Sequence, residues 1–399
     1  MNSINAARVT IVGGCGHVGL PLGVALASRG FRVFALDTNL DAVDRVNDGQ
    51  VPFVEEGLEK LLLVELENSR FRATSDPSVI KDSSVLIVVI GTPVDDHLNP
   101  DPTSIRRVLS EVLDFIQDGH LVILRSTIFP GVTRLVEDFF NEAGKDVDVS
   151  FCPERIAEGF ALTELCSLPQ LVGARTDSAR TRSADLFSCL ADQIIHISPE
   201  EAELAKLFTN TWRYIKFAAA NQLYTIANDF GIDFERVRHA ITTNYPRAAD
   251  MPGPGFAAGP CLLKDTMQLA AFNNNQFTLG HSSMMVNEGL PLYIASKADH
   301  RYGLRDKCVG ILGMAFKGEN DDIRSSLAYK LKHVLQFRCR EVICADDNVK
   351  TDESLISEQD LVKSSDFIFI GAPHRRYRHL AIDQPVVDVW NVRGNGVLI

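Results

Sequence analysis

The chain has 399 residues, of which 45% are hydrophobic and 23% charged, and its formal net charge is −12. A chain of this length is usually too long to fold around a single hydrophobic core, so two or three domains are expected. The acidic balance argues against general binding of nucleic acid or of membrane surfaces, which requires a basic field. The longest strongly apolar run, Val85–Ile90, is too short to span a bilayer.

The eight cysteines are scattered along the chain, and none forms a Cys-x-x-Cys pair. We therefore expect no metal site and a reducing, cytoplasmic compartment. The sequence enters its first apolar run almost directly, without a charged-then-apolar leader, which is consistent with that expectation.

A glycine motif lies at the start of the chain. A β-branched run, 8–12, leads into Gly-x-Gly-x-x-Gly at Gly14, Gly16 and Gly19, and a second strand ends at Asp37. In this strand–turn–helix context the glycines let the backbone approach a pyrophosphate, and the acid accepts hydrogen bonds from ribose hydroxyls. An acid there disfavours a 2′-phosphate, so NAD is predicted over NADP. The alternative is a glycine turn in an α/β unit that binds no ligand.

Further buried parallel strands are predicted from apolar runs at 85–90, 121–124 and 147–151. Each ends in a polar loop, and such loops lie at the carboxyl edge of a parallel sheet, where ligands bind. These loops carry Thr92, Thr127 and Glu154. Taken one at a time, such residues are usually caps or solvated side chains.

One long helix is predicted from Pro199 to Phe230, because apolar residues recur at helical spacing with no interior glycine or proline. Lys206 and Asn210 are four residues apart and share a face of it. The alternative is an ordinary solvated face. A further helix is predicted from about Gly280 to Ala298.

Between these helices lies Pro252–Asp265, in which three prolines and three glycines exclude a regular helix or strand up to Cys261. Helix formers follow the cysteine, so Cys261 is predicted at a loop-to-helix junction, where amide groups and the helix dipole stabilise a thiolate. The alternative is that Cys261 is a small buried hydrophobe.

The last third has a second α/β pattern, with strands at 308–312, 341–344, 367–370 and 386–390 and a helix at 327–335. It lacks the glycine motif. The predicted fold is therefore α/β, with two Rossmann-like doubly wound domains joined by a central helical domain. The expected domains are 1–197, 198–300 and 301–399.

Together these segments resemble the nucleotide-sugar 6-dehydrogenases, a family that includes the UDP-glucose, UDP-N-acetylmannosamine and GDP-mannose dehydrogenases. The motifs that carry the resemblance, in chain order, are Gly14-x-Gly-His-Val-Gly19, Gly91-Thr-Pro-Val94, Ser126-Thr-Ile-Phe-Pro-Gly131, Cys152-Pro-Glu-Arg155, Ala205-Lys-Leu-Phe-Thr-Asn210, Gly259-Pro-Cys-Leu-Leu-Lys-Asp265 and Ala315-Phe-Lys317.

The resemblance implies an N-terminal NAD domain, a helical centre that forms a homodimer, and a C-terminal nucleotide-sugar domain. It also implies oxidation of the sugar C6 alcohol to a carboxylate with two NAD per sugar. Cys261 would add to the intermediate aldehyde, and the thiohemiacetal would be oxidised to a thioester and then hydrolysed. A role in surface polysaccharide biosynthesis follows from the family alone.

The resemblance assigns a role to individual residues. Lys206 would stabilise oxyanions at C6, Asn210 would hold substrate, Asp265 with Thr127 would position a water, and Glu154 would serve in hydrolysis. The NAD contacts would be Gly14, Gly16, His17, Val18, Gly19, Asp37, Thr92, Pro93, Thr127, Glu158, Lys264 and Arg324. The substrate contacts would be Glu154, Arg155, Lys206, Asn210, Gly255, Phe256, Phe316 and Lys317, with Arg247 reaching the substrate of a neighbouring subunit.

The sequence departs from the family pattern where Ala258-Gly259 replaces a usual pair of glycines, and at Gly13, an additional glycine before the motif. The arginine after Glu154 resembles the N-acetylhexosamine branch, so a UDP-N-acetylhexosamine is the predicted substrate, with UDP-N-acetylmannosamine first. Lys264-Asp265 is common in the UDP-glucose branch, which keeps UDP-glucose as the alternative.

Two other functions remain open at this point. A β-hydroxyacid dehydrogenase also couples an NAD domain to a Lys-x-x-x-Asn helix, but it needs neither Cys261 nor a third domain. A non-catalytic sensor of NAD or nucleotide sugar has its only support in Ala258.

Overall fold

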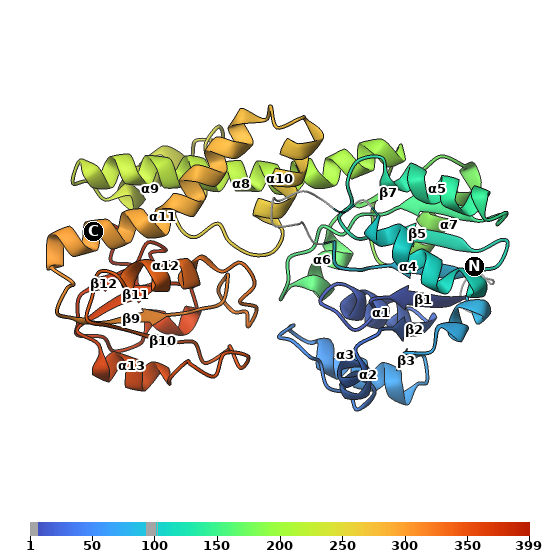
Figure 1. Ribbon diagram of the computed structural model, residues 1–399, viewed down its shortest axis with the longest axis horizontal. Coiled ribbons are helices and arrows are strands. Elements are labelled where there is room, and N and C mark those ends of the chain that lie inside the picture. The colour runs from blue at the N-terminus through green and yellow to red at the C-terminus, as the bar shows by residue number, and fades with distance from the viewer. Residues whose placement is uncertain (1–6, 93–100, 102) are drawn as a thin grey trace. The chain divides into compact units, whose positions relative to one another are not determined.

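The computed structural model describes residues 7–92, 101 and 103–399, and the predicted cofactor residue Pro93 lies outside them. The chain forms two compact units, residues 1–208 and 209–399, and helix α8 (Pro199–Asp229) runs through the boundary (Figure 1). In the described part of the chain, no helix combines the length and the apolarity that crossing a membrane requires.

The first unit is built on a sheet that has eight strands among the described residues. The strands are β1 (Arg8–Val12), β2 (Arg32–Leu36), β3 (Phe71–Thr74), β4 (Val85–Val88), β5 (Leu121–Leu124), β6 (Asp148–Phe151), β7 (Gln170–Ala174) and β8 (Ile194–Ile197). Their order is β3-β2-β1-β4-β5-β6-β7-β8, and neighbours are parallel except β6 and β7, which are antiparallel. The reversal of strand order beside β1 is the doubly wound arrangement.

Helices cover both faces of this sheet. They are α1 (Gly19–Ser28), α2 (Leu40–Asn47), α3 (Leu58–Glu67), α4 (Ser104–Val112), α5 (Val132–Glu142), α6 (Ala161–Ser167) and α7 (Asp177–Phe187), with short 3₁₀ turns η1 (Pro77–Asp82) and η2 (Leu113–Phe115). Along β4, Ile87 packs into one core while Leu86 and Val88 pack into the other. Because both faces are buried, the strand is apolar throughout, as its sequence predicted.

Strand β4 ends two residues before the apolar run does. The Ser126 hydroxyl accepts a hydrogen bond from the Ile90 N–H (2.7 Å) and donates one to the Ile90 carbonyl (2.8 Å). A side chain thus takes the two backbone groups that would otherwise continue the ladder. The chain is released into a loop at the carboxyl edge of the sheet.

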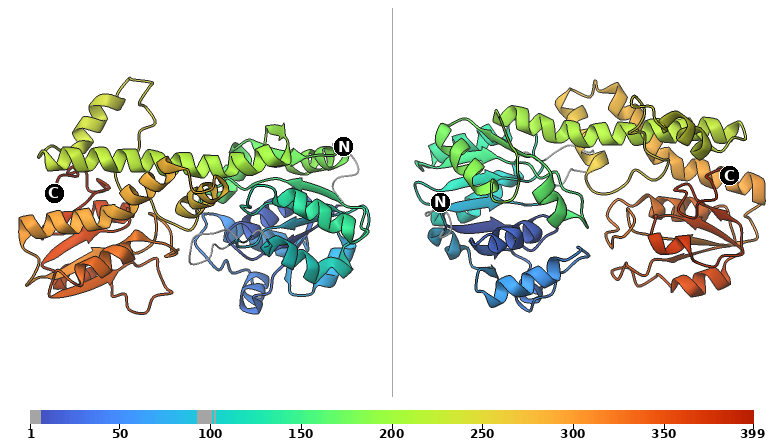
Figure 2. Two further views of the ribbon diagram at one scale, coloured as in Figure 1. Left: turned by 45° about the horizontal axis from the view of Figure 1, so that its top comes forward. Right: turned by 180° about the vertical axis from the view of Figure 1, so that it is seen from behind.

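Helix α8 agrees with the predicted long helix to within one residue at its C-terminal end (Figure 2). Pro199 occupies its first turn, where a missing N–H costs nothing, and Glu200 and Glu201 complement the positive end of the helix dipole.

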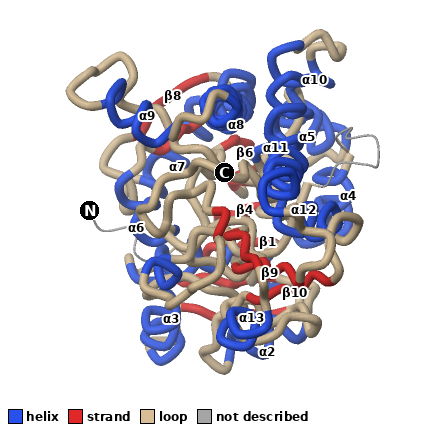
Figure 3. The backbone as a smooth tube through the Cα atoms, turned by 90° about the vertical axis from the view of Figure 1, so that its left-hand side faces the viewer, coloured by secondary structure: helices blue, strands red, loops and turns tan. Residues whose placement is uncertain are grey.

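The second unit contains helices α9 (Phe234–Thr242), α10 (Leu262–Phe272), α11 (Thr278–Tyr302), α12 (Leu327–Leu335) and α13 (Glu358–Ser364), and the 3₁₀ turn η3 (Arg375–Arg378). Its described strands are β9 (Cys308–Leu312), β10 (Glu341–Ala345), β11 (Phe367–Ile370) and β12 (Val386–Val387), parallel in the order β10-β9-β11-β12. Strands β9 and β10 of this sheet are labelled in Figure 3. The predicted α/β class, with two Rossmann-like sheets and helices between them in sequence, is confirmed.

Strand β12 is shorter than the predicted 386–390. The Asp388 carboxylate accepts hydrogen bonds from the N–H groups of Trp390 (3.2 Å) and Arg393 (2.9 Å). These bonds form a turn immediately after Val387, so the backbone leaves the extended conformation there.

Candidate active site

The glycine turn after β1 is shaped by close packing. A Cβ atom on Gly14 would lie 2.5 Å from Cα of Ala35, and one on Gly19 would overlap the Gly13 carbonyl. Gly13 itself has φ +76°, and a side chain there would overlap the carbonyl of Val89. Within the described part of the chain, a Cβ on Gly16 would meet only the Gly13 oxygen, at 3.7 Å, so the backbone is accessible at that point. The turn therefore fits the pyrophosphate of a dinucleotide at the N-terminus of α1.

Asp37 lies beside this turn, directly after β2. Its carboxylate accepts hydrogen bonds from the N–H groups of Cys15 (3.1 Å) and Asn39 (3.1 Å) and is only half-buried. The remaining lone pairs suit ribose hydroxyls. Val18 immediately precedes α1, and the His17 ring stacks on Phe53 with centroids 4.1 Å apart.

The loops after β4 and β5 are joined to each other. Beside the Ser126–Ile90 contacts, the buried Thr92 hydroxyl donates to the Thr127 carbonyl over 2.6 Å. Thr92 and Thr127 thus lie together at the carboxyl edge of the sheet that also carries the glycine turn. This arrangement is the one that their positions after β4 and β5 predicted.

Glu154 is held tightly. Its carboxylate pairs with the buried guanidinium of Arg125 and accepts hydrogen bonds from the N–H groups of Arg155 (2.7 Å) and Ile156 (2.9 Å). Arg155 is half-buried; its guanidinium donates to the Pro169 carbonyl, and burial lowers its pKa, against the effect of Glu154. Both residues are therefore held within the first unit, and their predicted contacts to substrate stay predictions.

Two residues of the first unit were missed by sequence reasoning. Arg125 also donates to the carbonyl of Cys152 (3.0 Å) and to the Gln170 amide (3.0 Å). Glu203 accepts from the N–H groups of Gly131 (2.7 Å) and Thr133 (2.8 Å), and so caps α5 from α8. Burial raises the pKa of Glu203, although these hydrogen bonds oppose the shift. One signal was available for Arg125, because it directly follows the apolar strand β5, and a charged side chain that is buried there must find a partner.

Helix α8 carries the next pair. Lys206 and Asn210 lie one turn apart, and both side chains are buried. Asn210 belongs to the second unit, where its Nδ2 donates to Oδ2 of Asp265 over 2.6 Å. Asp265 is fully buried, and the ammonium of Lys264 lies 3.8 Å from its Oδ1.

Cys261 occupies the N-cap position of α10, and its side chain is exposed. Its carbonyl accepts the N–H of Asp265 (2.9 Å), which closes the first helical turn. The loop-to-helix junction is thus as predicted, and the alternative of a buried hydrophobe is wrong. None of the eight cysteines, all of which lie in described residues, forms a disulfide.

The loop before Cys261 is anchored at Gly255. Asn221 of α8 accepts the Gly255 N–H (2.9 Å) and donates to the Gly255 carbonyl (3.0 Å), and Asn287 of α11 accepts from Asn221 (2.9 Å). A Cβ on Gly255 would overlap the Trp390 indole, and the Phe256 ring meets that indole edge-on. Asn221, Asn287 and Trp390 were not predicted from the sequence.

A second anchor lies at Gly259. Its N–H donates to the Ser325 carbonyl (3.3 Å), and a Cβ there would lie 2.6 Å from the Phe316 ring. The Lys317 ammonium is 5.6 Å from the centre of the same ring. Ala258 packs against the core of the second unit, so its methyl group is accommodated.

Two predicted residues lie on other segments of the second unit. The exposed Arg324 pairs with Asp322, with 2.8 Å between Nε and Oδ2. Arg247 is exposed and stacks on Tyr245 at 5.9 Å from the ring centre. Glu158 is half-buried in the loop after β6 of the first unit.

Three family models match successive parts of this chain, and all three describe the UDP-glucose/GDP-mannose dehydrogenase family. The NAD binding domain matches residues 7–191, the central domain 200–288 and the UDP binding domain 310–395. A UDP-N-acetyl-D-mannosamine dehydrogenase from Pyrococcus horikoshii is 29% identical over 385 residues, covering 93% of this chain and 90% of the relative.

Solved structures agree with these matches. The structure of the UDP-D-ManNAc dehydrogenase from Pyrococcus horikoshii has a TM-score of 0.87 at 26% identity and covers 94% of this chain and 91% of the other. A UDP-glucose dehydrogenase from Pyrobaculum islandicum has a TM-score of 0.90 at 26% identity, covering 98% and 97%.

Proposed function

The chain belongs to the UDP-glucose/GDP-mannose dehydrogenase family and is an NAD-dependent nucleotide-sugar dehydrogenase, and we propose that it oxidises the C6 alcohol of a UDP-N-acetylhexosamine to the carboxylate. The observation that carries this proposal is the position of Cys261, whose side chain is exposed at the N-terminus of α10. Asp265, which is buried and hydrogen-bonded to Asn210, lies one helical turn further along α10.

The sugar is proposed from two sources. Relatives named UDP-N-acetyl-D-mannosamine dehydrogenase occur in Pyrococcus horikoshii and Yersinia pestis, at 29% and 25% identity. Arg155 follows Glu154 in this chain, as in the N-acetylhexosamine branch. UDP-N-acetylmannosamine is therefore the first candidate. The TM-score of 0.90 with the Pyrobaculum islandicum UDP-glucose dehydrogenase supports UDP-glucose as the second.

NAD, when bound, accepts the hydride in each of the two oxidations. In the first, the C6 hydroxyl loses a proton and C6 loses a hydride, which leaves an aldehyde. The Cys261 thiolate then adds to the aldehyde carbon, and the ammonium of Lys206 stabilises the oxyanion that forms. Loss of a second hydride from C6 produces a thioester on Sγ.

Water then attacks the thioester carbon, the C–S bond breaks, and Cys261 is regenerated with the sugar carboxylate. Asp265, held by Asn210, accepts a proton from this water. The parts assigned to Thr127 and Glu154 by the family resemblance stay predictions. Per sugar, the balance is one water consumed, two NAD reduced and three protons released.

A homodimer is part of the proposal. One side of α8 carries exposed apolar residues at Trp212, Leu223 and Ile226, Phe230 follows directly after the helix, and α9 adds Val237 and Ile241. Apolar surface of this extent is typical of a subunit interface. The absence of disulfides among the eight cysteines suits a reducing, cytoplasmic compartment, and a uronic acid product suits the supply of surface polysaccharide precursors.

The test is the NADH yield at limiting sugar nucleotide, on UDP-N-acetylmannosamine, UDP-N-acetylglucosamine, UDP-N-acetylgalactosamine, UDP-glucose and GDP-mannose. We expect two NADH per sugar on the true substrate. Cys261→Ser should lower turnover by about 10³-fold or more, whereas Cys166→Ser, at a partly buried cysteine of the first unit, should not. A yield of one NADH, or an active Cys261→Ser variant, would refute the covalent route.

A further inference from the structure

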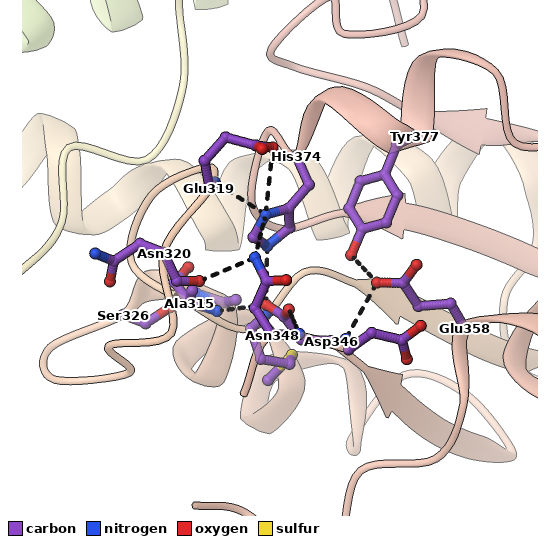
Figure 4. A network of polar contacts seen from close by, with 12 residues as sticks. Ala315, Glu319, Asn320, Ser326, Asp346, Asn348, Glu358, His374 and Tyr377 are labelled. Carbon is purple, nitrogen blue, oxygen red and sulfur yellow. Dashed lines mark hydrogen bonds and ion pairs between the residues drawn. The ribbon is translucent and has the colours of Figure 1, made fainter. Parts of the chain in front are cut away.

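A buried histidine–aspartate pair lies at the carboxyl edge of the second sheet (Figure 4). Asp346 directly follows β10 and His374 follows β11, and both side chains are shielded from solvent. Nε2 of His374 is 3.0 Å from Oδ2 of Asp346. The reaction proposed above uses neither residue.

The hydrogen bonds around the ring assign its proton. The Glu319 N–H donates to Nδ1 of His374 over 3.0 Å, so Nδ1 carries no hydrogen, and Nε2–H donates to Asp346. Burial tends to raise the pKa of Asp346, but hydrogen bonds from His374, Ala315 and Met314 hold it below its ordinary value. Asp346 is therefore an ionised acceptor at neutral pH.

Asp346 holds the backbone of the segment that follows β9. Its Oδ2 also accepts the N–H groups of Met314 (2.8 Å) and Ala315 (3.0 Å), which immediately precede Phe316 and Lys317. Two N–H groups and one imidazole thus converge on a single carboxylate oxygen. Loss of that oxygen, or rotation of the carboxylate, would break these hydrogen bonds and free the backbone segment that contains Phe316.

The segment is pinned to the chain around His374 at three points. A Cβ on Gly313 would lie 2.6 Å from the Ala372 nitrogen, a Cβ on Gly318 would overlap the Pro373 carbonyl, and the Glu319 N–H bonds to His374. Residues 313–319 therefore pack directly against residues 372–374, and the Glu319–His374 hydrogen bond joins the two segments.

The Phe316 ring joins residues 313–319 to the loop that precedes Cys261. Phe316 packs against Gly259, two residues before Cys261, and its own N–H donates to the Asp322 carbonyl (2.9 Å). Around the pair, Arg376 lies 3.3 Å from Oδ1 of Asp346 and is braced by Glu358, while the Glu319 carboxylate lies 3.8 Å from Nδ1.

The first sheet has an acid at the same topological place. Asp37 follows β2 as Asp346 follows β10, and each strand is the parallel neighbour of the first strand of its sheet. Asp37 is half-buried and, among the described residues, accepts hydrogen bonds from the backbone N–H groups of Cys15 and Asn39, whereas Asp346 is buried and also contacts His374 and Arg376. The position that is predicted to contact a ligand in the first sheet thus contacts a loop in the second.

We propose that His374 and Asp346 are positioning residues, which hold residues 313–319 in the conformation that receives the nucleoside diphosphate part of the substrate. The proposal rests on the function proposed above and on the prediction that Phe316 and Lys317 contact the nucleotide sugar. A segment that is already ordered loses less conformational entropy when it binds.

The test measures binding of UDP and of NAD to the full-length protein by calorimetry. His374→Leu removes the hydrogen bonds of the ring to Glu319, Asn348 and Asp346, and Asp346→Asn points an amide donor at a donor. Each should weaken UDP binding about tenfold and leave NAD binding within about twofold, because only residues 313–319 lose their order. His374→Gln retains a donor and an acceptor and should restore most of the UDP affinity.

The matched control is His120, a buried histidine of the first unit whose Nδ1 accepts the Gln117 N–H (3.3 Å). His120→Leu should lower the melting temperature without changing UDP affinity. If His374→Leu and Asp346→Asn behave in the same way, or lose UDP and NAD binding equally, the positioning role is refuted. If His374→Leu does not fold, the isosteric Asp346→Asn decides alone. A wild-type protein that binds no UDP would refute the proposed function instead.

Discussion

Asn210 and Asp265 are joined by a 2.6 Å hydrogen bond that connects α8 to α10. Asp265 is fully buried, lies four residues after Cys261 and donates its own N–H to the Cys261 carbonyl. The orientation of the cysteine therefore depends on an amide that comes from a different helix. A buried carboxylate without such a partner would be costly.

Asn210→Asp replaces this amide by a second carboxylate of the same shape. Two carboxylates at this distance cannot both ionise, so the contact survives only when one is protonated. We expect a loss of about 1–3 kcal/mol in the free energy of unfolding and a large fall in kcat. Urea denaturation and NADH formation measure the two effects.

The control for this change is Asn141→Asp, at an exposed position of α5. It makes the same chemical substitution where water solvates the new charge, and should alter neither quantity. Equal behaviour of the two variants would mean that the Asn210–Asp265 contact has no energetic importance.

Gly255→Ala tests the anchor of the reactive loop. The added methyl group would overlap the Trp390 indole, so the loop or the ring must move. We expect a destabilisation of about 1–3 kcal/mol and slower turnover, measured by thermal denaturation and initial rates. Gly289→Ala in α11, where no described residue outside the helix backbone lies within 4 Å of the new atom, should be neutral or stabilising.

The steric cause can be isolated with a double mutant. In a Trp390→Ala background the ring is absent, so Gly255→Ala should cost less than it does in the wild type. Additive costs would show that the strain has another origin.

Most of the fold followed from the sequence. Strands buried on both faces are apolar throughout, and α8 has helical periodicity without an interior breaker, so β4, β5, β9 and α8 appeared close to their predicted places. The errors lie at strand ends. Strands β4 and β12 stop early because Ser126 and Asp388 hydrogen-bond nearby backbone groups, and side-chain contacts of that kind leave no periodic pattern in a sequence.

Site residues that belong to a local sequence motif were predictable, whereas residues that depend on contacts between distant segments were not. The glycine turn and Cys261 were recognised from local spacing. Asn221 and Glu203 act through partners far away in the chain, at Gly255 and Gly131, and no local pattern distinguishes them from other buried polar residues. Gly13, read from sequence as a departure, is required by its positive φ and by the neighbouring Val89 carbonyl.

Thiol reactivity should single out Cys261. Burial raises the pKa of Cys15 to about 12, with Asp37 adding to the shift, and burial raises those of Cys152 and Cys344 to about 11 and 12. A raised pKa leaves fewer thiolates at a given pH, roughly one in a thousand or fewer at pH 8 for these three. Cys261 is exposed at a helix N-terminus.

Iodoacetamide at pH 8 should therefore alkylate Cys261 well before those three cysteines, and activity should fall in step with that labelling. Peptide mass spectrometry over a time course measures both rates. Labelling of Cys15 at the rate of Cys261, or inactivation while Cys261 is still unmodified, would contradict this expectation.

The proposed dimer depends on the exposed apolar side of α8. Ile226→Glu puts a charge on that side without entering the core, because the isoleucine is 59% exposed in the subunit. We expect the folded subunit to persist and the dimer to dissociate, since the charge would be desolvated only in the interface. Light scattering after size exclusion gives the mass. Phe337→Glu, at a phenylalanine that is 92% exposed between α12 and β10, makes a comparable change outside α8 and α9 and should leave the mass unchanged. If Ile226→Glu keeps the wild-type mass, or if the wild type is itself a monomer, this side of α8 is not the interface.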